Sequence, residues 1–252
     1  MSYKIEMNNG IAKFIINRPE MRNAINHAVM DGLETFLSKV ESDESIAFAV
    51  ITGEGDRAFC SGGDLSEFHG FRTADEAYPM LSKMAGLLYR LSILPVPVIA
   101  LVNGAAVGGG CEIATACDYR LVSSKSKAGF IQGTLAITSG WGGASQLFIK
   151  MNNHDKAMQF LSEARVHSAE QLHAFGWATY IYEGDAQAGL EQFISDMKRI
   201  HPSVHRAYKR LAILKWEQSG LGIHMLEEAA QCAKLWESDA HHEAVAKFLN
   251  KK

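Results

Sequence analysis

The stretch VPVIALVNGAAVGGGCEIATACDYRLVS, residues 96–123, is the part of the sequence that decides the predicted fold. Its beginning, Val96–Gly104, is almost wholly apolar, which is typical of a strand buried on both faces of a sheet. Three consecutive glycines, Gly108–Gly110, then lead into a segment with helical apolar spacing. A further strand is predicted over Asp118–Ser124. The succession of strand, helix and strand indicates an α/β protein.

Strands and helices alternate in the same way through the preceding part of the chain. Tyr3–Asn17 predicts two short strands around an Asn-Asn-Gly turn, and Ile46–Gly55 predicts a buried strand. Apolar residues at helical spacing predict helices over His27–Val40 and Asp75–Leu94. Beyond Asp155 the spacing is almost wholly helical, so the last part of the chain is expected to consist of helices.

The composition is that of a soluble globular protein. The chain has 252 residues, 47% hydrophobic and 21% charged, with a formal net charge of −3. It has no Lys/Arg-rich run, so nucleic acid is not expected as a partner; no apolar run reaches the roughly 20 residues of a membrane span. Its four cysteines lack metal-binding spacing, and its N-terminus lacks a targeting pattern. We expect a cytoplasmic protein with one domain over 1–252, comprising a core (1–195) and a C-terminal helical region (196–252).

The glycine triplet has a chemical interpretation as well as a structural one. Glycines before a helix leave backbone N–H groups open to a ligand at the positive end of the helix dipole. The spacing matches neither nucleotide-binding glycine motif, so an oxyanion that forms during a reaction is the better candidate ligand. A second glycine turn, FCSGGDL at Phe59–Leu65, offers a second donor. The structural alternative is a tight turn with an acid, Glu112, placed favourably in the first turn of a helix.

Four segments carry a resemblance to a known family: GIAKFIINRPEMRNAIN (10–26), VITGEGDRAFCSGGDL (50–65), PVIALVNGAAVGGGCEIATACDYRLVS (97–123) and EAVAKFLNKK (243–252). In this order they resemble the enoyl-CoA hydratase/isomerase, or crotonase, family over nearly the whole chain. The resemblance implies a spiral of ββα turns with a C-terminal helical trimerisation region, assembled as a homotrimer or a dimer of trimers (a homohexamer). It also implies an acyl-CoA substrate of fatty acid metabolism, with CoA as part of the substrate and with neither a separate cofactor nor a metal.

The resemblance also implies roles for particular residues. The backbone N–H groups of Gly63 and Gly109 match the oxyanion hole that stabilises a thioester enolate, and Glu112 matches a catalytic carboxylate. The positions that match CoA or substrate contacts are Arg22, Ala24, Gly63, Asp64, Leu65, Ser66, Gly109, Phe248 and Lys251. The alternative interpretations are structural: an isolated surface arginine, a turn cap at Asp64 and a solvated lysine near the end of the chain.

The sequence departs from the family at the second catalytic acid. Hydration of an enoyl thioester uses two carboxylates, and the second is expected within Phe130–Ile149. That segment contains no Asp, Glu, His, Lys or Arg. Aligning from the Gly142–Gly143 pair places Gln132 at the missing acid, whereas aligning from Phe130 places Thr134 there. Neither side chain is a general acid near neutral pH.

Several functions therefore stay open within the family. The expected activity is a lyase of enoyl-CoA hydratase/isomerase type with one acid missing. Ala114–Gly143 resembles the ethylmalonyl-CoA decarboxylase branch, so the alternative is a decarboxylase of methylmalonyl- or ethylmalonyl-CoA. A CoA-ester-binding pseudoenzyme is a further alternative. An RNA-binding relative has only weak support, from the basic stretch at His205–Lys215.

Overall fold

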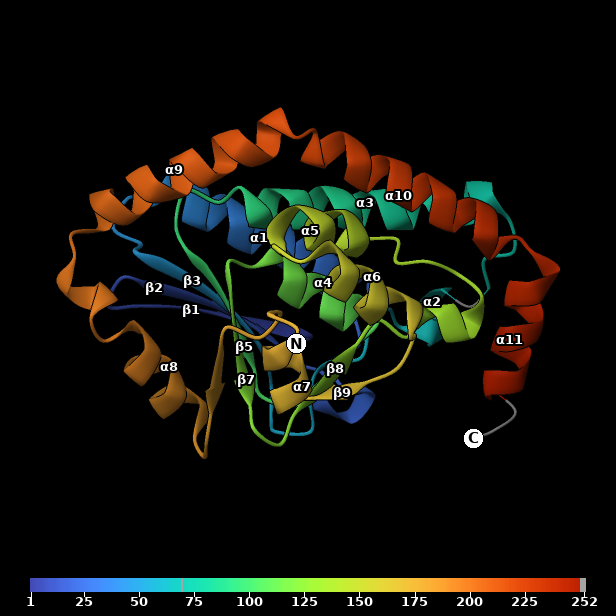
Figure 1. The fold of residues 1–252 in the computed structure, drawn as a ribbon, viewed down its shortest axis with the longest axis horizontal. Coiled ribbons are helices and arrows are strands. Elements are labelled where there is room, and N and C mark those ends of the chain that lie inside the picture. The colour runs from blue at the N-terminus through green and yellow to red at the C-terminus, as the bar shows by residue number, and fades with distance from the viewer. Residues whose placement is uncertain (69, 250–252) are drawn as a thin grey trace.

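Two sheets form the centre of the computed structural model, which describes residues 1–68 and 70–249. The larger sheet has the order β1 (Tyr3–Asn8), β2 (Ile11–Ile16), β3 (Phe48–Gly53), β5 (Val98–Val102), β7 (Tyr119–Ser123) and β10 (Tyr180–Tyr182). The smaller sheet has the order β4 (Ala58–Cys60), β6 (Ala105–Val107), β8 (Lys127–Gly129) and β9 (His167–Ser168). Figure 1 shows helices covering these sheets.

The helices follow the strands in a repeating order. They are α1 (His27–Ser42), α2 (Leu65–Phe68), α3 (Ala74–Ser92), α4 (Gly109–Ala116), α5 (Gly143–Lys150), α6 (His154–Ser162), α7 (Ala169–Ala174), α8 (Ala186–Ile194), α9 (Pro202–Gln218), α10 (Leu221–Trp236) and α11 (Asp239–Leu249), with single 3₁₀ turns η1 (Pro19–Met21), η2 (Gln132–Leu135) and η3 (Met197–Arg199). The pairs β3–β4, β5–β6 and β7–β8 each place one strand in each sheet before the chain turns into helices. This arrangement confirms the predicted spiral of ββα turns.

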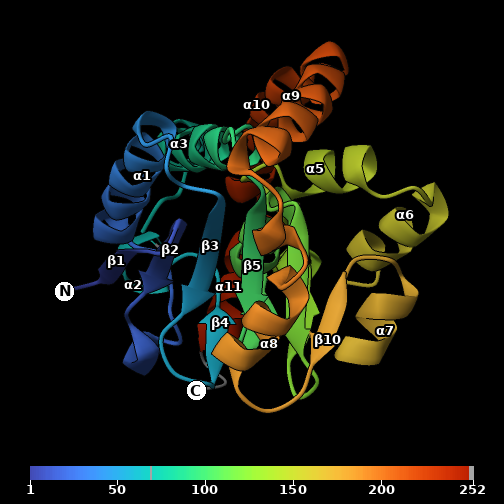
Figure 2. The same ribbon diagram turned by 90° about the vertical axis from the view of Figure 1, so that its left-hand side faces the viewer.

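The central strands β3 and β5 of the larger sheet are buried on both faces, as their apolar sequences predict, whereas the edge strand β1 is largely exposed. In β3, Phe48 and Val50 belong to a small core that includes Leu190 of α8, whereas Ala49 and Ile51 belong to the main core. Successive strand residues point to opposite faces, so an apolar residue at every position suits a sheet covered on both sides. Figure 2 shows α8 in front of the sheet, with α1 and α3 beside and above it.

The predicted elements before Asp155 are present, and the region after it is mostly helical as predicted, except for two short strands. β9 and β10 lie in that region, and β10 extends the larger sheet by pairing with β7. Both strands are too short, at two and three residues, to show an alternating pattern. Within α3, Pro79 lies inside the helix. The division of the domain at residue 195 stays a prediction.

The C-terminal helices α9 and α10 form an arch over α3 and α5 (Figure 1), with α10 packed along α3. Lys209 of α9 anchors this arch, because its buried ammonium group lies 2.7 and 2.5 Å from the two carboxylate oxygens of Asp118. The Lys150 ammonium at the end of α5 donates to the carbonyls of Ala116 (2.6 Å) and Thr115 (3.2 Å) at the end of α4. The C-terminal region is thereby tied to the helix that carries Glu112.

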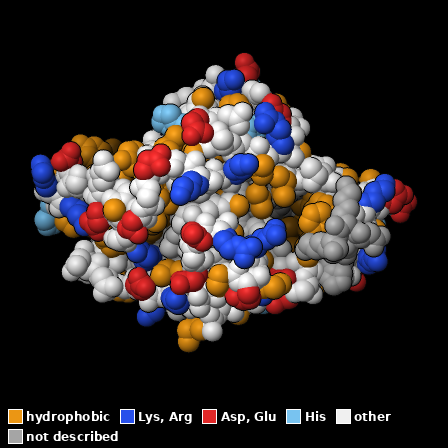
Figure 3. All heavy atoms as spheres, turned by 90° about the horizontal axis from the view of Figure 1, so that it is seen from below, with side chains coloured by type: hydrophobic (Ala, Val, Ile, Leu, Met, Phe, Trp, Pro, Cys, Tyr) orange, Lys and Arg blue, Asp and Glu red, His pale blue; other side chains and the backbone are white. Residues whose placement is uncertain are grey.

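The surface is mixed in charge. Seen from below, Lys and Arg side chains alternate with Asp and Glu, and hydrophobic side chains gather at the end of the molecule where α11 lies (Figure 3). On α9 and α10, Tyr208, Leu211 and Ile223 are 70%, 64% and 75% exposed. None of the helices in the described part of the chain combines the length and apolar character needed to cross a bilayer.

Candidate active site

Glu112 lies at the centre of the candidate site. It belongs to the first turn of α4, which follows the short strand β6, and its side chain is only 2% exposed. Its Oε2 atom accepts hydrogen bonds from the backbone N–H groups of Trp141 (2.8 Å) and Gly143 (2.9 Å). A Cβ atom on Gly143 would lie 2.5 Å from Cγ of Glu112, so only glycine allows this approach. Glycine at position 143 thus allows the backbone to approach the carboxylate of Glu112 closely.

Gln132 occupies the position opposite the other oxygen of Glu112. Its Nε2 atom donates to Glu112 Oε1 over 2.9 Å, and the Gly140 N–H makes a longer contact of 3.4 Å with the same oxygen. Thr134, the other residue proposed for the missing acid, is exposed and donates its hydroxyl to the carbonyl of Ile131 (2.7 Å). The structure therefore places Gln132, and not Thr134, against Glu112.

A second carboxylate, Glu228 of α10, binds the same turn from the other side. Its oxygens accept from the hydroxyls of Ser139 (2.5 Å) and Ser145 (2.6 Å). They also accept from the backbone N–H groups of Ala144 (3.0 Å) and Ser145 (2.7 Å). Glu228 could not be identified from the sequence, because nothing in the local pattern of an amphipathic helix shows that one of its acids binds a distant turn.

The environment of Glu112 favours its neutral form. Burial raises the pKa of Glu112, and the negative charge of Glu228 raises it further, while the N–H groups of Gly143, Trp141 and Gly140 lower it. The net result is a pKa of about 8, so the carboxyl group carries a proton at neutral pH. A buried neutral carboxyl group is suited to donate a proton in a reaction.

Each glycine of the triplet has a structural reason, which is backbone conformation at Gly108 and close packing at Gly109 and Gly110. Gly108 has a φ of 57°, a conformation that favours glycine. A Cβ atom on Gly109 would lie 2.1 Å from the indole ring of Trp141, and one on Gly110 would lie 2.0 Å from the carbonyl oxygen of Cys60. The missing side chains therefore make room for groups of this chain. Clearance for a substrate carbonyl stays a prediction.

The two glycine turns lie next to one another. A Cβ atom on Gly62 would be 3.3 Å from the backbone nitrogen of Gly109, and one on Gly63 would be 3.6 Å from the Trp141 ring. Within residues 1–68 and 70–249, no acceptor binds the N–H of Gly63 or of Gly109. Two unpaired donors and an indole ring thus lie together near Glu112.

The predicted CoA-binding segments are also adjacent. The Ile25 N–H donates to Gly62 O, and the Asp64 N–H donates to Ile25 O, each over 2.8 Å. These bonds join the segment that contains Arg22 and Ala24 to the turn that leads into α2. Arg22 is exposed and Ala24 is buried. The structure therefore brings together two segments that lie far apart in the sequence.

Asp64 has a structural role in this arrangement. It is buried, and its carboxylate pairs with Arg18 over 2.7 Å and accepts from the N–H (2.9 Å) and hydroxyl (2.6 Å) of Ser66. Burial raises the pKa of Asp64, but the bonds from Ser66 and Arg18 outweigh that effect and lower it. Arg18 was not identified as a site residue, although it lies within the quoted segment GIAKFIINRPEMRNAIN (10–26).

The remaining predicted contact residues lie at α2 and near the end of the chain. Leu65 begins α2 and is half-buried, and Ser66 is exposed. Phe248 lies on α11 and is 42% exposed. Lys251 lies outside the described residues. The contact of Phe248 and Lys251 with CoA stays a prediction.

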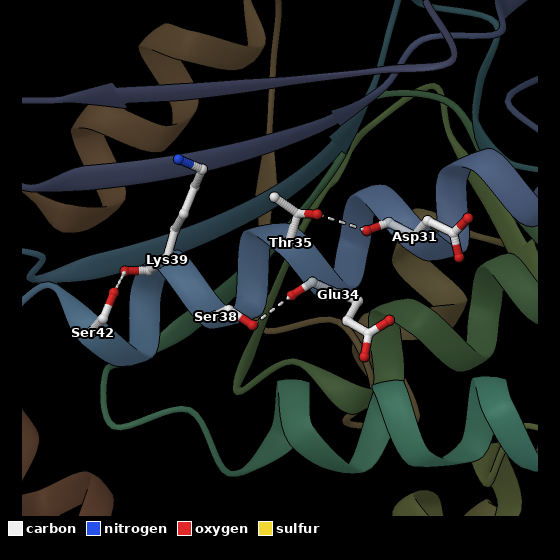
Figure 4. A pocket seen from close by; sticks show the side chains of 6 residues that line it. All are labelled: Asp31, Glu34, Thr35, Ser38, Lys39 and Ser42. Atoms are coloured by element: carbon white, nitrogen blue, oxygen red, sulfur yellow. Dashed lines mark hydrogen bonds between the residues drawn. The ribbon is translucent and has the colours of Figure 1, made fainter.

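A separate hollow lies on the outer side of α1. It is lined by Asp31, Glu34, Thr35, Ser38, Lys39 and Ser42 (Figure 4). The hydroxyls of Thr35 and Ser38 donate to backbone carbonyls one helical turn earlier, so they are occupied by the helix itself. The hollow contains none of the predicted site residues. In the described ranges, no cluster of three or more His, Cys, Asp or Glu side chains is arranged to hold a metal ion.

Comparison with known proteins places the chain in a family. Residues 6–214 match the profile of the enoyl-CoA hydratase/isomerase family. An ethylmalonyl-CoA decarboxylase of Xenopus tropicalis is 34% identical over 96% of this chain and 81% of its own length. A short-chain-enoyl-CoA hydratase of Clostridium acetobutylicum is 27% identical over 98% of this chain and 94% of its own.

The fold agrees with these matches. The crystal structure of an enoyl-CoA hydratase from Bacillus halodurans superposes with a TM-score of 0.88, at 17% identity, over 98% of this chain and 100% of the other. Both the predicted fold and the predicted resemblance to the decarboxylase branch are confirmed. The chain belongs to the enoyl-CoA hydratase/isomerase family.

Proposed function

We propose that this protein stabilises an acyl-CoA enolate and that its reaction is the decarboxylation of a malonyl-type thioester, such as methylmalonyl- or ethylmalonyl-CoA. The observation that carries the proposal is the buried Glu112, whose pKa is raised by burial and which has the amide of Gln132 beside it where a second acid was expected. One protonated acid is sufficient to quench an enolate. Hydration uses two acid–base groups to direct and activate water. The 34% identity to an ethylmalonyl-CoA decarboxylase supports the same choice.

The unpaired N–H groups of Gly63 and Gly109 are the proposed oxyanion hole. Loss of CO2 breaks the bond between the α-carbon and the carboxylate and leaves its electron pair in an enolate. The negative charge then lies largely on the thioester oxygen, where two N–H donors stabilise it. Loss of one such donor typically costs roughly 10²–10³ in rate.

Glu112 is the proposed proton donor for the second step. Its proton moves to the α-carbon, which yields the saturated acyl-CoA and the Glu112 carboxylate. The N–H groups of Trp141 and Gly143, at 2.8 and 2.9 Å, are already placed to stabilise that carboxylate. A proton from water then restores the neutral acid. The balance of the reaction is one CO2 released and one proton taken up.

Hydration of an enoyl-CoA is the second candidate, and it is favoured by the 27% identity to a short-chain-enoyl-CoA hydratase over 98% of this chain. Glu112 alone would then direct the water and handle the α-proton. General acid–base assistance is worth about 10²–10⁴ in rate, so crotonyl-CoA hydration is expected to fall short of a two-glutamate hydratase by about that factor. Both candidates are lyases.

The decisive experiment compares substrates on the purified protein. Release of CO2 from methylmalonyl-CoA and ethylmalonyl-CoA, and hydration of crotonyl-CoA, are measured with wild type and Glu112→Gln. We expect decarboxylation of a malonyl-type substrate to exceed hydration and to depend on Glu112. Faster hydration of crotonyl-CoA would overturn the assignment. Tight binding of all three thioesters without turnover would instead identify a CoA-ester-binding pseudoenzyme.

The proposal includes the contacts with CoA and the assembly. Arg22, Ala24 and the Gly63–Ser66 turn would hold CoA, since these two segments are joined by hydrogen bonds. The exposed apolar side chains of Tyr208, Leu211 and Ile223 support burial against other copies in a homotrimer or a dimer of trimers. Light scattering at micromolar concentration tests the assembly, and a monodisperse monomer would contradict it. A cytoplasmic location is part of the same proposal.

A further inference from the structure

The first turn of α5 lies between two carboxylates that come from different helices. The Gly143 N–H donates to Glu112 on α4, whereas the Ala144 and Ser145 N–H groups donate to Glu228 on α10. These amides lie at a helix start, where no acceptor within the helix is available. The two acids therefore satisfy neighbouring donors of one helix.

The residues before α5 also bind and pack closely against α10. The Ser139 hydroxyl donates to Glu228, and a Cβ atom on Gly140 would lie 2.8 Å from Sγ of Cys232. A Cβ atom on Gly142 would lie 2.4 Å from the side chain of Met225. Since this turn also supplies the N–H groups that bind Glu112, α10 determines where those donors lie.

We propose that Glu228 is a positioning residue for Glu112: it fixes the Ser139–Ser145 turn, and its negative charge retains the proton on Glu112. Its own oxygens are engaged by four donors of the turn, so it acts through the turn and through its charge, without contact to the substrate. The use of the retained proton in catalysis rests on the proposed function. The electrostatic relation between the two acids does not.

The distribution of charge follows from burial and from hydrogen bonds. Two carboxylates that interact closely share protons as a pair, and a like charge nearby disfavours the ionised form of either. Burial raises the pKa of Glu228 as well as that of Glu112, but the hydroxyls of Ser139 and Ser145 lower the pKa of Glu228, and we therefore assign the proton to Glu112. The other titratable groups near Glu112 in the described chain are the thiols of Cys111 and Cys232, and burial raises the pKa of both. Glu228 is therefore the charge that acts on Glu112.

Gln132 contacts the carboxyl group of Glu112 but leaves one of its own polar atoms without a partner among the described residues. With Nε2 directed at Glu112, its Oε1 atom is buried and has no hydrogen-bond partner among the described residues. A buried polar atom without a partner is costly. Rotation of the amide by half a turn would only exchange an unpartnered Oε1 for an unpartnered Nε2, so this contact suits either protonation state of Glu112.

The test compares Glu228→Gln with a matched control, Glu227→Gln. Glu227 is the adjacent residue on α10, but it is exposed and paired with Gln231. A third variant, Ser145→Ala, removes hydroxyl bonding to Glu228 while the charge remains. The protonation of Glu112 is followed in the free, full-length protein by its infrared carboxyl band, which is assigned by its loss in Glu112→Gln. The pH dependence of decarboxylation is measured on the same variants.

We expect Glu228→Gln to lower the midpoint of the Glu112 band by about one pH unit or more, and to move the alkaline limb of the rate profile equally. Glu227→Gln is expected to leave both in place, and Ser145→Ala to move the midpoint far less than Glu228→Gln. A midpoint that is unchanged in folded Glu228→Gln would overturn the inference. A shifted band in a protein that decarboxylates neither substrate would uphold it and refute only the proposed function.

Discussion

The indole ring of Trp141 lies 2.1 Å from the point where a Cβ atom on Gly109 would be. Trp141 is buried, and its backbone N–H binds Glu112. Trp141 therefore contacts both a proposed oxyanion donor, Gly109, and the proposed proton donor, Glu112. A methyl group at Gly109 cannot be accommodated unless the ring moves.

Gly109→Ala is accordingly expected to impair both stability and activity. Overpacking of a filled core typically costs about 1–3 kcal/mol, and displacement of Trp141 would disturb the carboxyl group that its backbone binds. The measurements are urea unfolding and the turnover of the best substrate. Gly86→Ala is the matched control, since a Cβ atom there, inside α3, meets nothing within 4 Å. That change should raise helix stability by about 1 kcal/mol. Full activity of a stable Gly109→Ala protein would show that Trp141 can move without consequence.

Replacement of the proposed proton donor should abolish most activity. Glu112→Gln keeps the size of the side chain but has no transferable acidic proton, so the rate is expected to fall by about 10²–10⁴. Steady-state CO2 release from the malonyl-type substrate measures the loss. Unchanged binding of the product CoA ester is the control for an intact site. If the variant turned over at the rate of wild type, another group would have to supply the proton.

The pH dependence of stability should show the same acid independently of catalysis. The folded-state pKa of Glu112 is raised to about 8, above its ordinary value of 4.5. The folded protein therefore binds the proton more tightly than the unfolded chain, and this stabilisation is full below pH 4.5 and is lost as pH rises to about 8. Glu112→Gln removes this dependence, so its melting temperature relative to wild type should be higher at pH 8.5 than at pH 5.5. Parallel pH curves for the two proteins would contradict a raised pKa.

An acid at Gln132 should improve hydration, whereas an acid at Thr134 should not. Gln132→Glu would place a carboxyl group about where Nε2 now meets Glu112, so the two would share a proton and supply an acid and a base together. Thr134→Glu would add the same group at an exposed position. The assay is hydration of crotonyl-CoA by both variants. Equal rates in the two would remove the reason for assigning the missing acid to position 132.

The sequence predicted those parts of the site that depend on local pattern. The buried strand, the glycines and Glu112 form one continuous motif, and the structure has them in this order, with the short, unpredicted strand β6 between β5 and α4. The choice between Gln132 and Thr134 could be made only from the structure, because the 3₁₀ turn η2 directs the side chain of Gln132 toward Glu112 and leaves that of Thr134 exposed. Glu228 was not predictable, since its partners lie in a turn brought to α10 only by the packing of the whole fold. Short strands such as β9 and β10 were missed because sheet pairing, rather than periodicity, defines them.

The ion pair between Lys209 and Asp118 gives the arch of α9 and α10 a further significance. Lys209 belongs to α9, and Asp118 lies two residues beyond the end of the helix that carries Glu112. Glu228, on α10, accepts hydrogen bonds from Ser139 and from the first turn of α5, beside Glu112. A protein cut after residue 195 would lose both the cation that pairs with Asp118 and the carboxylate that caps α5. We therefore expect the geometry of the candidate site to depend on the C-terminal arch.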